Sequence, residues 1–421
     1  MYITSWHVVA LITAVSTVVT LAEVPREDWL TTAAISLSCG VSALSLMGAS
    51  AVLGGRLKPV ESVFGGLDRV YLVHKWLAIW ALAFAAVHFV FKAGMPDWQT
   101  ASIITLPPPY TRLARQLSLL ALGLIVLLAL NRKIPYSTWR WWHKLSGPLF
   151  LIVILHWLSF KSPITLSSPA GIWLALVASA GVLAAAYKLL LYPLISNRQR
   201  YRVVAANPAA AGLHLELEPV REVLRITPGQ FGFLSMKVDG LREPHPFTMI
   251  SGESTAGRVH LLIRNLGDYT SRLVREARPG MEAEIHAPFG RFLRRREAAT
   301  EVWIAGGVGV SPFIAWLADE AGESFEKVTF FYFYTPGREF PKVEVLKDLA
   351  QRHGAMLVAV SGGASSPQFA ERFRELVRRA GPEKVFISFC GPKGLLEHVR
   401  TAMRDLGVPR ENLHHEFFEF R

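Results

Sequence analysis

Four histidines stand in strongly apolar stretches of this sequence. His74 and His88 lie near the two ends of VHKWLAIWALAFAAVHF, and His143 and His156 are the end residues of HKLSGPLFLIVILH. Ionisable side chains inside a membrane are costly and usually functional, and neutral imidazole is a common axial ligand of haem iron. Separations of 14 and 13 residues correspond to roughly 20 Å of helix, enough for two stacked porphyrins. The histidines therefore predict two metal sites in the membrane. One would lie near the inner face, at His74 and His143, and the other near the outer face, at His88 and His156.

A structural role is the alternative for each histidine, because a membrane imidazole can simply hydrogen-bond to a neighbouring helix. Four histidines that pair by depth favour the ligand role. Helical periodicity raises one difficulty, since 14 positions return to nearly the same face but 13 positions miss it by about 140°. Pro148 lies between His143 and His156, and a kink there is expected to reorient the second imidazole. His7 has no such partner and is predicted to be structural or interfacial.

The composition divides the chain into two unlike parts. Of the 421 residues 51% are hydrophobic, the mean hydropathy is +0.29 and the formal net charge is +12. Residues 1–195 contain 14 Lys or Arg and 6 Asp or Glu, and the remaining residues contain 31 and 27. This contrast predicts a membrane part followed by a soluble part. The two cysteines, Cys39 and Cys390, exclude a disulfide framework and a cysteine-ligated iron–sulfur cluster within one chain.

The membrane part contains six runs of spanning length, about 17 to 25 residues, near 5–22, 30–53, 70–91, 112–130, 140–160 and 170–195. The first run lacks a basic flank and an A-x-A cleavage site, so we predict a retained helix and not a signal peptide. Basic residues such as Arg56, Arg132 and Arg198 are concentrated in loops on one side. This predicts a plasma or inner membrane protein whose termini and soluble part are cytoplasmic. Topology and anionic lipid explain the basic charge, so no nucleic acid is expected.

Alternating apolar strands from about 200 to 292 predict a small antiparallel β-barrel. Within it, HPFT at 245–248 lies between two strand-like segments, and Arg264 ends the strand RVHLLIRN. Gly267 and Asp268 then predict a turn, and Thr270 can open a helix as its N-cap.

From residue 300 the pattern changes to strand, glycine loop and helix. In EVWIAGGVGVSPFIAWL, three glycines follow an apolar strand and Ser311-Pro312 open a helix, an arrangement whose amides can hold a pyrophosphate. A tight turn with no ligand is the alternative. Further strands at KVTFFYFYT, MLVAVSGG and KVFISFCGP predict a doubly wound parallel sheet with its nucleotide crevice at the strand ends. Cys390 ends one of these strands, where a packing role is the alternative to a functional one.

The motifs HPFT, IRNLGDYT, FGRF, GGVGVSP and CGP follow the two histidine pairs in this order over nearly all of the chain. Together they resemble the NADPH oxidase and ferric reductase family. The resemblance implies a six-helix transmembrane haem bundle over residues 1–196, a FAD-binding β-barrel over 197–297 and a doubly wound NAD(P)H-binding domain over 298–421. Two b-type haems and FAD would be the cofactors. A flavin belongs between nicotinamide and haem because the first donates two electrons as hydride and the second accepts one.

The resemblance also implies roles for individual residues. His74 and His143 would ligate the inner haem, and His88 and His156 the outer haem. His245, Pro246, Phe247 and Thr248 would flank the isoalloxazine ring of FAD. Arg264 and Thr270 would hold its pyrophosphate, and Gly267, Asp268 and Tyr269 would belong to the same FAD site. The nicotinamide dinucleotide would lie on the glycine loop and the CGP strand end: Gly306, Gly307, Gly309, Ser311, Cys390, Gly391 and Pro392. Thr248, Cys390 and the terminal aromatic Phe420 would act at the hydride path, although a tail packed into the sheet is the alternative for Phe420.

The choice of nicotinamide rests on the end of the second nucleotide-domain strand. Thr335 and Arg338 suit a 2′-phosphate, so NADPH is expected, whereas Glu339 would suit NADH. Oxygen giving superoxide is the expected electron acceptor at the outer face, with a ferric chelate and a partner redox protein as the alternatives. Many oxidases of the family carry an arginine on the second span, which here has no charged residue over 30–53. A nucleotide-regulated membrane protein without haem is the alternative from another class.

Overall fold

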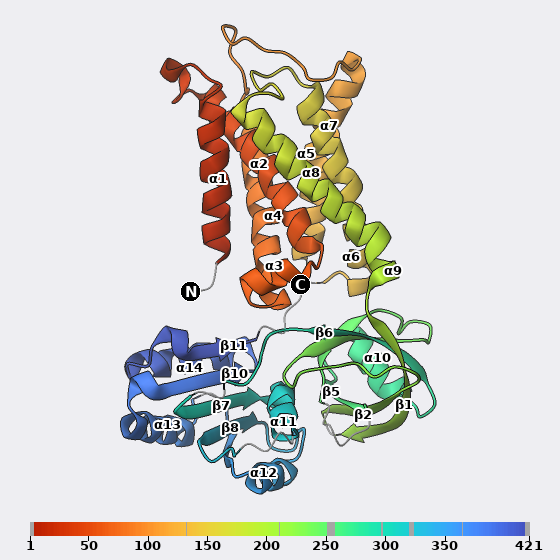
Figure 1. Ribbon diagram of the computed structural model, residues 1–421, viewed down its shortest axis with the longest axis vertical. Coiled ribbons are helices and arrows are strands. Elements are labelled where there is room, and N and C mark those ends of the chain that lie inside the picture. Colours follow the sequence, from red (N-terminus) through yellow and green to blue (C-terminus); the bar gives the residue numbers. More distant parts are fainter. Residues whose placement is uncertain are drawn as a thin grey trace. The chain divides into compact units, whose positions relative to one another are not determined.

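The computed structural model describes residues 4–131, 133–209, 211–250, 257–295, 298–319, 324–363 and 365–416. The chain divides into two compact units, one ending at Ser196 and the other beginning at Asn197. The first unit is helical, and the second contains two β-sheets with flanking helices (Figure 1).

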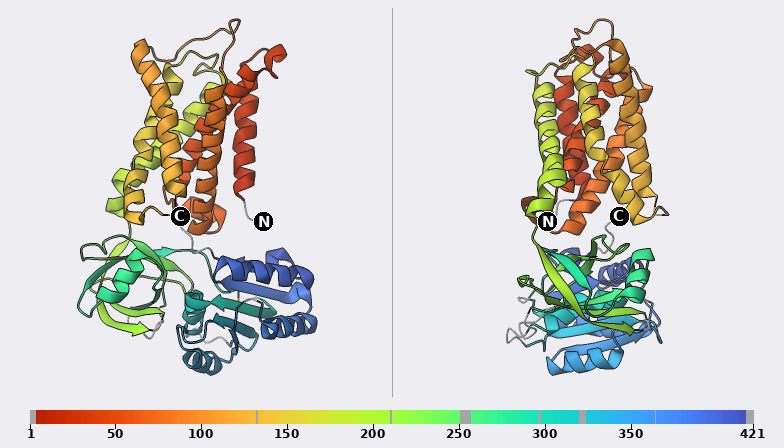
Figure 2. Two further views of the ribbon diagram at one scale, coloured as in Figure 1. Left: turned by 180° about the vertical axis from the view of Figure 1, so that it is seen from behind. Right: turned by 90° about the vertical axis from the view of Figure 1, so that its right-hand side faces the viewer.

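The long helices of the first unit run side by side (Figures 1 and 2): α1 (Ser5–Leu21), α2 (Thr32–Gly54), α4 (Leu67–Val90), α5 (Pro108–Leu130), α7 (Ser146–Ser159) and α8 (Pro169–Ala186). Shorter helical segments join or extend them: α3 (Lys58–Phe64), α6 (Tyr136–His143), the π-helical turn Tyr187–Leu191 and α9 (Tyr192–Ile195). Within the described residues four helices are long and apolar enough to cross a membrane: Thr32–Gly54, Leu67–Val90, Pro108–Leu127 and Pro169–Ile195.

The first predicted span has nearly its expected length, whereas the fifth is interrupted. The first forms the 17-residue helix α1, and the fifth is divided into α6 and α7 by a turn at Lys144 and Leu145. The N–H groups of these two residues donate to carbonyls three positions earlier, at 3.2 and 3.0 Å, which is the tighter 3₁₀ pattern. Pro148 lies in the first turn of α7, where a missing N–H removes no helical hydrogen bond. The interruption lies in the turn before Pro148, where the ring of a proline crowds the carbonyl of the residue four positions earlier, here Lys144.

α2 is the central helix of this unit, packed against α1, α4 and α8. Its buried face is rich in alanine, serine and glycine. A Cβ added to Gly48 would stand 2.6 Å from Cγ1 of Val177 on α8. Small residues let membrane helices approach closely, so the composition of α2 brings its neighbours near to one another.

The first sheet of the second unit has six strands: β1 (Arg198–Ala209), β2 (Gly212–Pro219), β3 (Phe231–Met236), β4 (His245–Thr248), β5 (Val259–Arg264) and β6 (Glu282–Phe289). Their order is β4-β3-β6-β1-β2-β5, with every neighbouring pair antiparallel. Two hydrogen bonds between Ile250 and His260, of 3.0 and 2.8 Å, join the segment after β4 to the edge strand β5. The sheet therefore curls as the predicted barrel requires, with α10 (Asp268–Glu276) covering one end of its core.

The second sheet is parallel and has five strands: β7 (Thr300–Gly306), β8 (Val328–Tyr334), β9 (Met356–Ser361), β10 (Val385–Cys390) and β11 (Leu413–His415). The helices that follow the first four are α11 (Ser311–Leu317), α12 (Val343–Arg352), α13 (Pro367–Ala380) and α14 (Lys393–Asp405). The order β11-β10-β7-β8-β9 reverses direction at β7. This is the predicted doubly wound sheet, whose crevice lies at the carboxyl ends of β7 and β10.

Candidate functional site

The two histidines of α4 are oriented by the backbone of α2. Nδ1 of His74 lies 2.8 Å from the carbonyl oxygen of Ser50, and Nδ1 of His88 lies 2.9 Å from that of Ser36. Because a carbonyl only accepts, Nδ1 is the protonated nitrogen in each ring and Nε2 carries the lone pair. A histidine whose other nitrogen donates to a backbone carbonyl is the usual arrangement of a metal ligand. Both α4 imidazoles are therefore prepared to coordinate through Nε2.

α6 and α7 bring a second imidazole to each of these rings. The ring centres of His74 and His143 are 6.0 Å apart, and those of His88 and His156 are 6.2 Å apart. An imidazole nitrogen lies about 2 Å from a metal that it ligates, and the ring centre lies about 1 Å beyond, so two imidazoles on opposite sides of one ion have centres about 6 Å apart. The observed spacing fits one metal ion between each pair.

The break between α6 and α7 removes the periodicity problem of the second pair. His143 is the last residue of α6 and His156 lies near the end of α7, so no single helix has to present both rings on one face. The Nδ1 atoms of His143 and His156 are buried and hydrogen-bond to no group in the described part of the chain. His143 instead stacks on Trp139, with ring centres 5.1 Å apart.

Two further residues of α2 touch the α4 histidines and were not predicted from the sequence. A Cβ on Gly40 would stand 2.8 Å from Nδ1 of His88, and one on Gly54 would stand 3.5 Å from Cε1 of His74. Gly40 and Gly54 are 14 residues apart, as are Ser36 and Ser50, which repeats the spacing of the α4 histidines. This shared spacing is the sequence signal that could have identified them.

In the barrel, β4 carries the four residues of the HPFT motif. The ring of His245 stacks on Tyr269, with centres 3.7 Å apart, so one face of the imidazole is covered by protein. Pro246 and Phe247 pair with β3, and Thr248, opposite Phe231, is buried. Tyr269 donates its hydroxyl to the carbonyl of Leu241, and burial together with the charge of Glu243 raises its pKa. The HPFT motif is therefore held in place by strand pairing with β3 and by the stacking of His245 on Tyr269.

The turn after β5 presents an exposed arginine. Arg264 ends the strand, and its Nη1 lies 3.8 Å from where a Cβ on Gly307 would stand. The hydroxyl of Thr270 accepts the N–H groups of Leu266 and Gly267, each at 3.0 Å. Asp268 similarly accepts the N–H of Tyr269, at 2.9 Å. Thr270 and Asp268 thus shape the turn, while Arg264 reaches the glycine loop of the second sheet.

The glycine loop packs directly on the end of β10. A Cβ on Gly309 would stand 2.2 Å from the carbonyl oxygen of Cys390, and one on Gly306 would stand 2.6 Å from Cδ of Pro392. Only glycine permits this approach at either position. Ser311 is buried and its hydroxyl donates to the carbonyl of Val308 at 2.8 Å, so this side chain braces the loop. The residues predicted from GGVGVSP and CGP, including Gly391, therefore meet in one crevice.

The strand end predicted to recognise a 2′-phosphate is exposed. β8 ends at Tyr334, and both Thr335 and Arg338 lie on the surface of the following turn. The N–H of Arg338 donates to the carbonyl of Thr335 at 3.0 Å. The carboxylate of Glu339 accepts the N–H of Gly337 at 2.9 Å, so the acid that favoured NADH in the sequence is engaged by its own turn.

Comparison with known families identifies both parts of the chain. Residues 39–155 match the family described as "Ferric reductase like transmembrane component", and residues 203–293 match "Oxidoreductase FAD-binding domain". The chain has the architecture of the NADPH oxidase and ferric reductase family. It is accordingly a membrane protein with an oxidoreductase FAD-binding domain of the ferredoxin-reductase type.

Individual relatives are similar to about half of this ferric reductase-like protein. The flavohemoprotein of Pseudomonas putida is 26% identical over 204 residues, which cover 47% of this chain and 52% of the relative. The ferredoxin reductase component of 3-ketosteroid-9-alpha-monooxygenase from Mycobacterium tuberculosis is 27% identical over 211 residues, covering 48% and 57%. The chain thus spans about half the length of these curated relatives. A solved flavohemoglobin from Malassezia yamatoensis shares only the fold, with a TM-score of 0.50 and 17% identity over 96% of this chain and 99% of that one.

One buried acid in the ferric reductase-like protein was not predicted from the sequence. Glu416 is 6% exposed, and a Cβ on Gly290 would stand 3.0 Å from its Oε1. Burial raises the pKa of the Cys390 thiol well above its usual value, and the carboxylate of Glu416 adds to that rise. Glu416 therefore brings a carboxyl group beside Cys390. The first glutamate of HHEFFEF was the available sequence signal for it. The predicted aromatic residue Phe420 lies outside the described residues.

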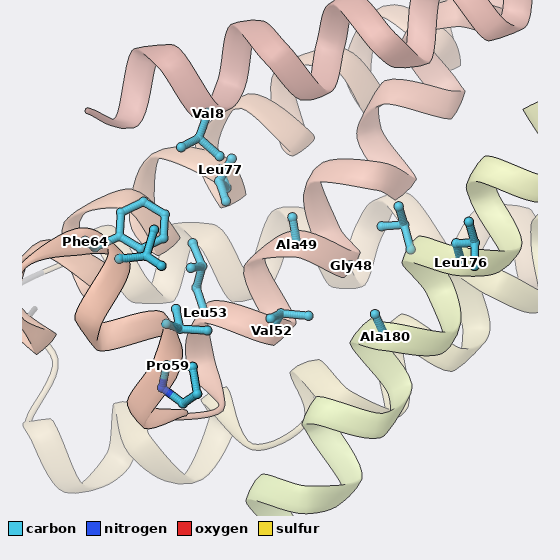
Figure 3. Close-up of a pocket in the computed structure, with 13 residues that line it drawn as sticks. Val8, Gly48, Ala49, Val52, Leu53, Pro59, Phe64, Leu77, Leu176 and Ala180 are labelled. Carbon is cyan, nitrogen blue, oxygen red and sulfur yellow. The ribbon is translucent and has the colours of Figure 1, made fainter. Parts of the chain in front are cut away.

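A groove of about 490 Å³ lies between α2, α3 and α8 (Figure 3). Its lining is apolar throughout and includes Ala49, Val52, Phe64, Leu77 and Ala180. None of the four membrane histidines lines it. Because the groove offers no side-chain donor or acceptor, it cannot orient a polar ligand, and in a bilayer a lipid chain can fill it.

Proposed function

We propose that this protein carries electrons from cytoplasmic NADPH through FAD and two b-type haems to an acceptor on the outer face of a membrane. The observation that carries this proposal is the pairing of four membrane imidazoles at 6.0 and 6.2 Å. A haem bound between each pair would supply one-electron transfer. α1 and the divided helix α6–α7 would complete a six-span bundle over residues 1–196.

His74 with His143 would hold the inner haem, and His88 with His156 the outer haem. Ser50 and Ser36 fix the tautomer and orientation of the two α4 ligands through their carbonyl oxygens. The positive-inside distribution of Arg and Lys supports placing His74 and His143 near the cytoplasm. The termini and the soluble unit would then be cytoplasmic, in a plasma or inner membrane.

FAD would bind to the barrel, residues 197–297, with its ring against β4 and its pyrophosphate at Arg264. A planar guanidinium suits a phosphate because it donates parallel hydrogen bonds. Thr248 is buried at the end of β4 and can offer a hydroxyl to the flavin edge. Thr270 and Asp268 would act indirectly, since their side chains are engaged in shaping the turn that follows Arg264.

NADPH would bind to residues 298–421, across the crevice of the parallel sheet. Gly306, Gly307 and Gly309 allow its pyrophosphate to approach the backbone, and Arg338 would meet the 2′-phosphate. The engagement of Glu339 by Gly337 supports NADPH over NADH. Cys390 and Glu416 lie together at the end of β10, where the nicotinamide would meet the flavin. The raised pKa of Cys390 implies a neutral thiol, so this side chain itself adds no charge to the crevice.

Oxygen, reduced to superoxide, is the acceptor that we propose. A ferric chelate is the second candidate, supported by the ferric reductase-like match over residues 39–155 and by the absence of charge in 30–53. A partner redox protein is the third. With none of these three electron acceptors would the protein need to bind nucleic acid.

The test is optical and uses the purified, FAD-supplemented protein in detergent. NADPH is added without oxygen while the haem Soret band is followed, and air is then admitted. Reduction followed by reoxidation at the rate of turnover would support an oxidase. Haem that stays reduced until a ferric chelate or partner is added would support a reductase. A protein with no Soret band would contradict the haem proposal.

A further inference from the structure

Two histidines of the barrel form a pair that the proposed electron path does not use. His214 lies on β2 and His260 on the neighbouring edge strand β5. Nδ1 of His260 is 3.3 Å from Nε2 of His214, and the ring centres are 5.4 Å apart. Both side chains are half-buried on the outer surface of the barrel. One nitrogen of each ring therefore faces the other ring.

The spacing of these nitrogens matches two ligands of one metal ion. Imidazole nitrogens lie about 2 Å from a bound Zn²⁺, and two ligands of a tetrahedral ion at that distance are about 3.3 Å apart. A shared proton can also hold the two rings at this distance in the metal-free protein. Binding a metal would replace that proton and would require little movement of either ring.

A carboxylate stands beside the pair. Glu216 is two residues from His214 on β2, and it is the direct cross-strand partner of His260, so all three side chains share one face of the sheet. Its charge acts on the pKa of both histidines. Oε1 of Glu216 accepts from Arg258 at 2.9 Å. A carboxylate has capacity for further bonds, so a change of rotamer would let Glu216 join the imidazoles.

We propose that His214 and His260 bind a divalent transition-metal ion, with Glu216 and water completing its coordination. Imidazole with carboxylate suits Zn²⁺ and Cu²⁺. The described residues contain no preformed group of three His, Cys, Asp or Glu ligands, so the two imidazoles are the primary ligands and Glu216 is recruited on binding.

The site would tie the edge strand of the barrel to its neighbour. β5 pairs with β2 from Leu217↔Val259 to Gly212↔Arg264, and the metal would join the two strands in the middle of this ladder. Arg264 lies four residues beyond His260 on β5. Metal binding is therefore expected to raise the melting temperature of the barrel and to slow the loss of FAD.

Both histidines must be neutral to ligate a metal. Burial is the main cause that lowers the pKa of each; His260 lowers that of His214 further, Arg258 lowers that of His260, and Glu216 opposes the shift in both. The other strand beside His214 contributes Asn207, which carries no charge.

The experiment is calorimetric titration of Zn²⁺ into the full-length, EDTA-treated protein in detergent at pH 7. We expect one equivalent to bind, and His214→Gln and His260→Gln each to weaken it by more than about 100-fold, a larger effect than removing an outer-sphere partner. Glu216→Gln should weaken it by about tenfold. His398→Gln is the control, because His398 lies on α14 and bonds to Gly394. Unchanged binding in both pair variants would overturn the proposal.

A second measurement needs no variant and therefore does not depend on whether a substituted barrel folds. Cu²⁺ added at one equivalent to the wild-type holoprotein should give an electron paramagnetic resonance signal split by two imidazole nitrogens. A signal with oxygen ligands only would overturn the proposal. Neither readout depends on the haems, on FAD reduction or on the acceptor, so failure here would leave the proposed electron path untouched.

Discussion

The two imidazoles of each membrane pair are supported in opposite ways. On the α4 side, Nδ1 of each histidine donates to a backbone carbonyl of α2. His74 donates to Ser50, and His88 donates to Ser36. On the other side, Nδ1 of His143 and of His156 is buried with no hydrogen-bond partner among the described residues. One imidazole of each pair is thus oriented by hydrogen bonding and the other by packing.

This difference follows from the helices that carry the ligands. α2 and α4 are continuous, and their contacts repeat every 14 residues, so one register places both supports. α6 and α7 are separated by the turn at Lys144 and Leu145, so their two ligands have no common register. We call His74 and His88 on α4 the rigid side of the two pairs, and His143 and His156 on α6 and α7 the adaptable side. The rigid side can set the position of a bound metal while the adaptable side adjusts to it, and the following variants test this comparison.

The largest expected effect comes from removing a ligand. His88→Ala should abolish binding of the outer haem and so halve the haem content, while flavin reduction by NADPH survives because the soluble unit is unchanged. His156→Ala should do the same, since a haem with one protein ligand is weakly held. Haem content by absorbance and anaerobic flavin reduction measure the two effects, with His7→Ala as the control. Loss of flavin reduction together with haem would contradict a separable chain.

The next largest effect is expected from adding a methyl group beside His88, on the rigid side. Gly40→Ala would place a Cβ 2.8 Å from Nδ1 of His88, whereas Gly54→Ala would place one at an ordinary 3.5 Å from His74. We expect Gly40→Ala to displace the imidazole and weaken outer-haem binding by about 10- to 100-fold, the range found when support of a metal ligand is lost. Gly54→Ala is the matched control and should retain its haem. Equal losses in both would contradict the contact geometry.

On the adaptable side, a smaller loss is expected from Trp139→Leu. This change removes the stack on His143, and aromatic pairs contribute about 0.5–1.5 kcal/mol, or up to about tenfold in inner-haem affinity. The rate at which haem transfers to apomyoglobin would measure the loss. Trp142→Leu serves as the control, because the ring of Trp142 packs edge-on against Trp141 and not against His143. An unchanged rate in Trp139→Leu would mean that packing does not orient His143.

The smallest effect should come from Ser36→Ala. The serine hydroxyl donates to the carbonyls of His88 and Phe91, but the backbone carbonyl that accepts from Nδ1 of His88 stays in place. Loss of a net hydrogen bond of about 0.5 kcal/mol corresponds to roughly twofold in affinity. Haem retention during gel filtration would show it. A loss as large as that of Gly40→Ala would mean that the hydroxyl, and not the carbonyl, orients the ring.

Several features followed from local sequence. The parallel strands β7, β8 and β10 are nearly continuous apolar runs, as strands buried on both faces must be, and glycine-containing loops follow them. The six-span count was less predictable because hydropathy does not show where a helix breaks. The turn before Pro148 depends on backbone hydrogen bonds of Lys144 and Leu145, and nothing in the composition of 140–160 distinguishes it from a kink at the proline.

Site residues divide in the same way. The types of His74, His88, His143 and His156 already suggested metal ligation, since membrane imidazoles are costly without a role. The supporting roles of Ser36, Gly40 and Glu416 depend on contacts between segments far apart in the chain. Similarly, Thr270 and Ser311 carry suitable hydroxyls, but only the fold shows that Leu266, Gly267 and Val308 occupy them.

The sequence by itself determined the contrast between an apolar first part and a more charged second part, the strands β7 to β10 of the parallel sheet and the chemistry of the candidate ligands. These properties depend on hydropathy, periodicity and residue type, which are local. Tertiary structure decided which ring nitrogen of His74 and His88 is protonated, how the 13-residue spacing is accommodated and which polar side chains remain available to a ligand. Those outcomes depend on helix and strand packing, because a hydrogen bond or a steric contact exists only once its two partners have been brought together.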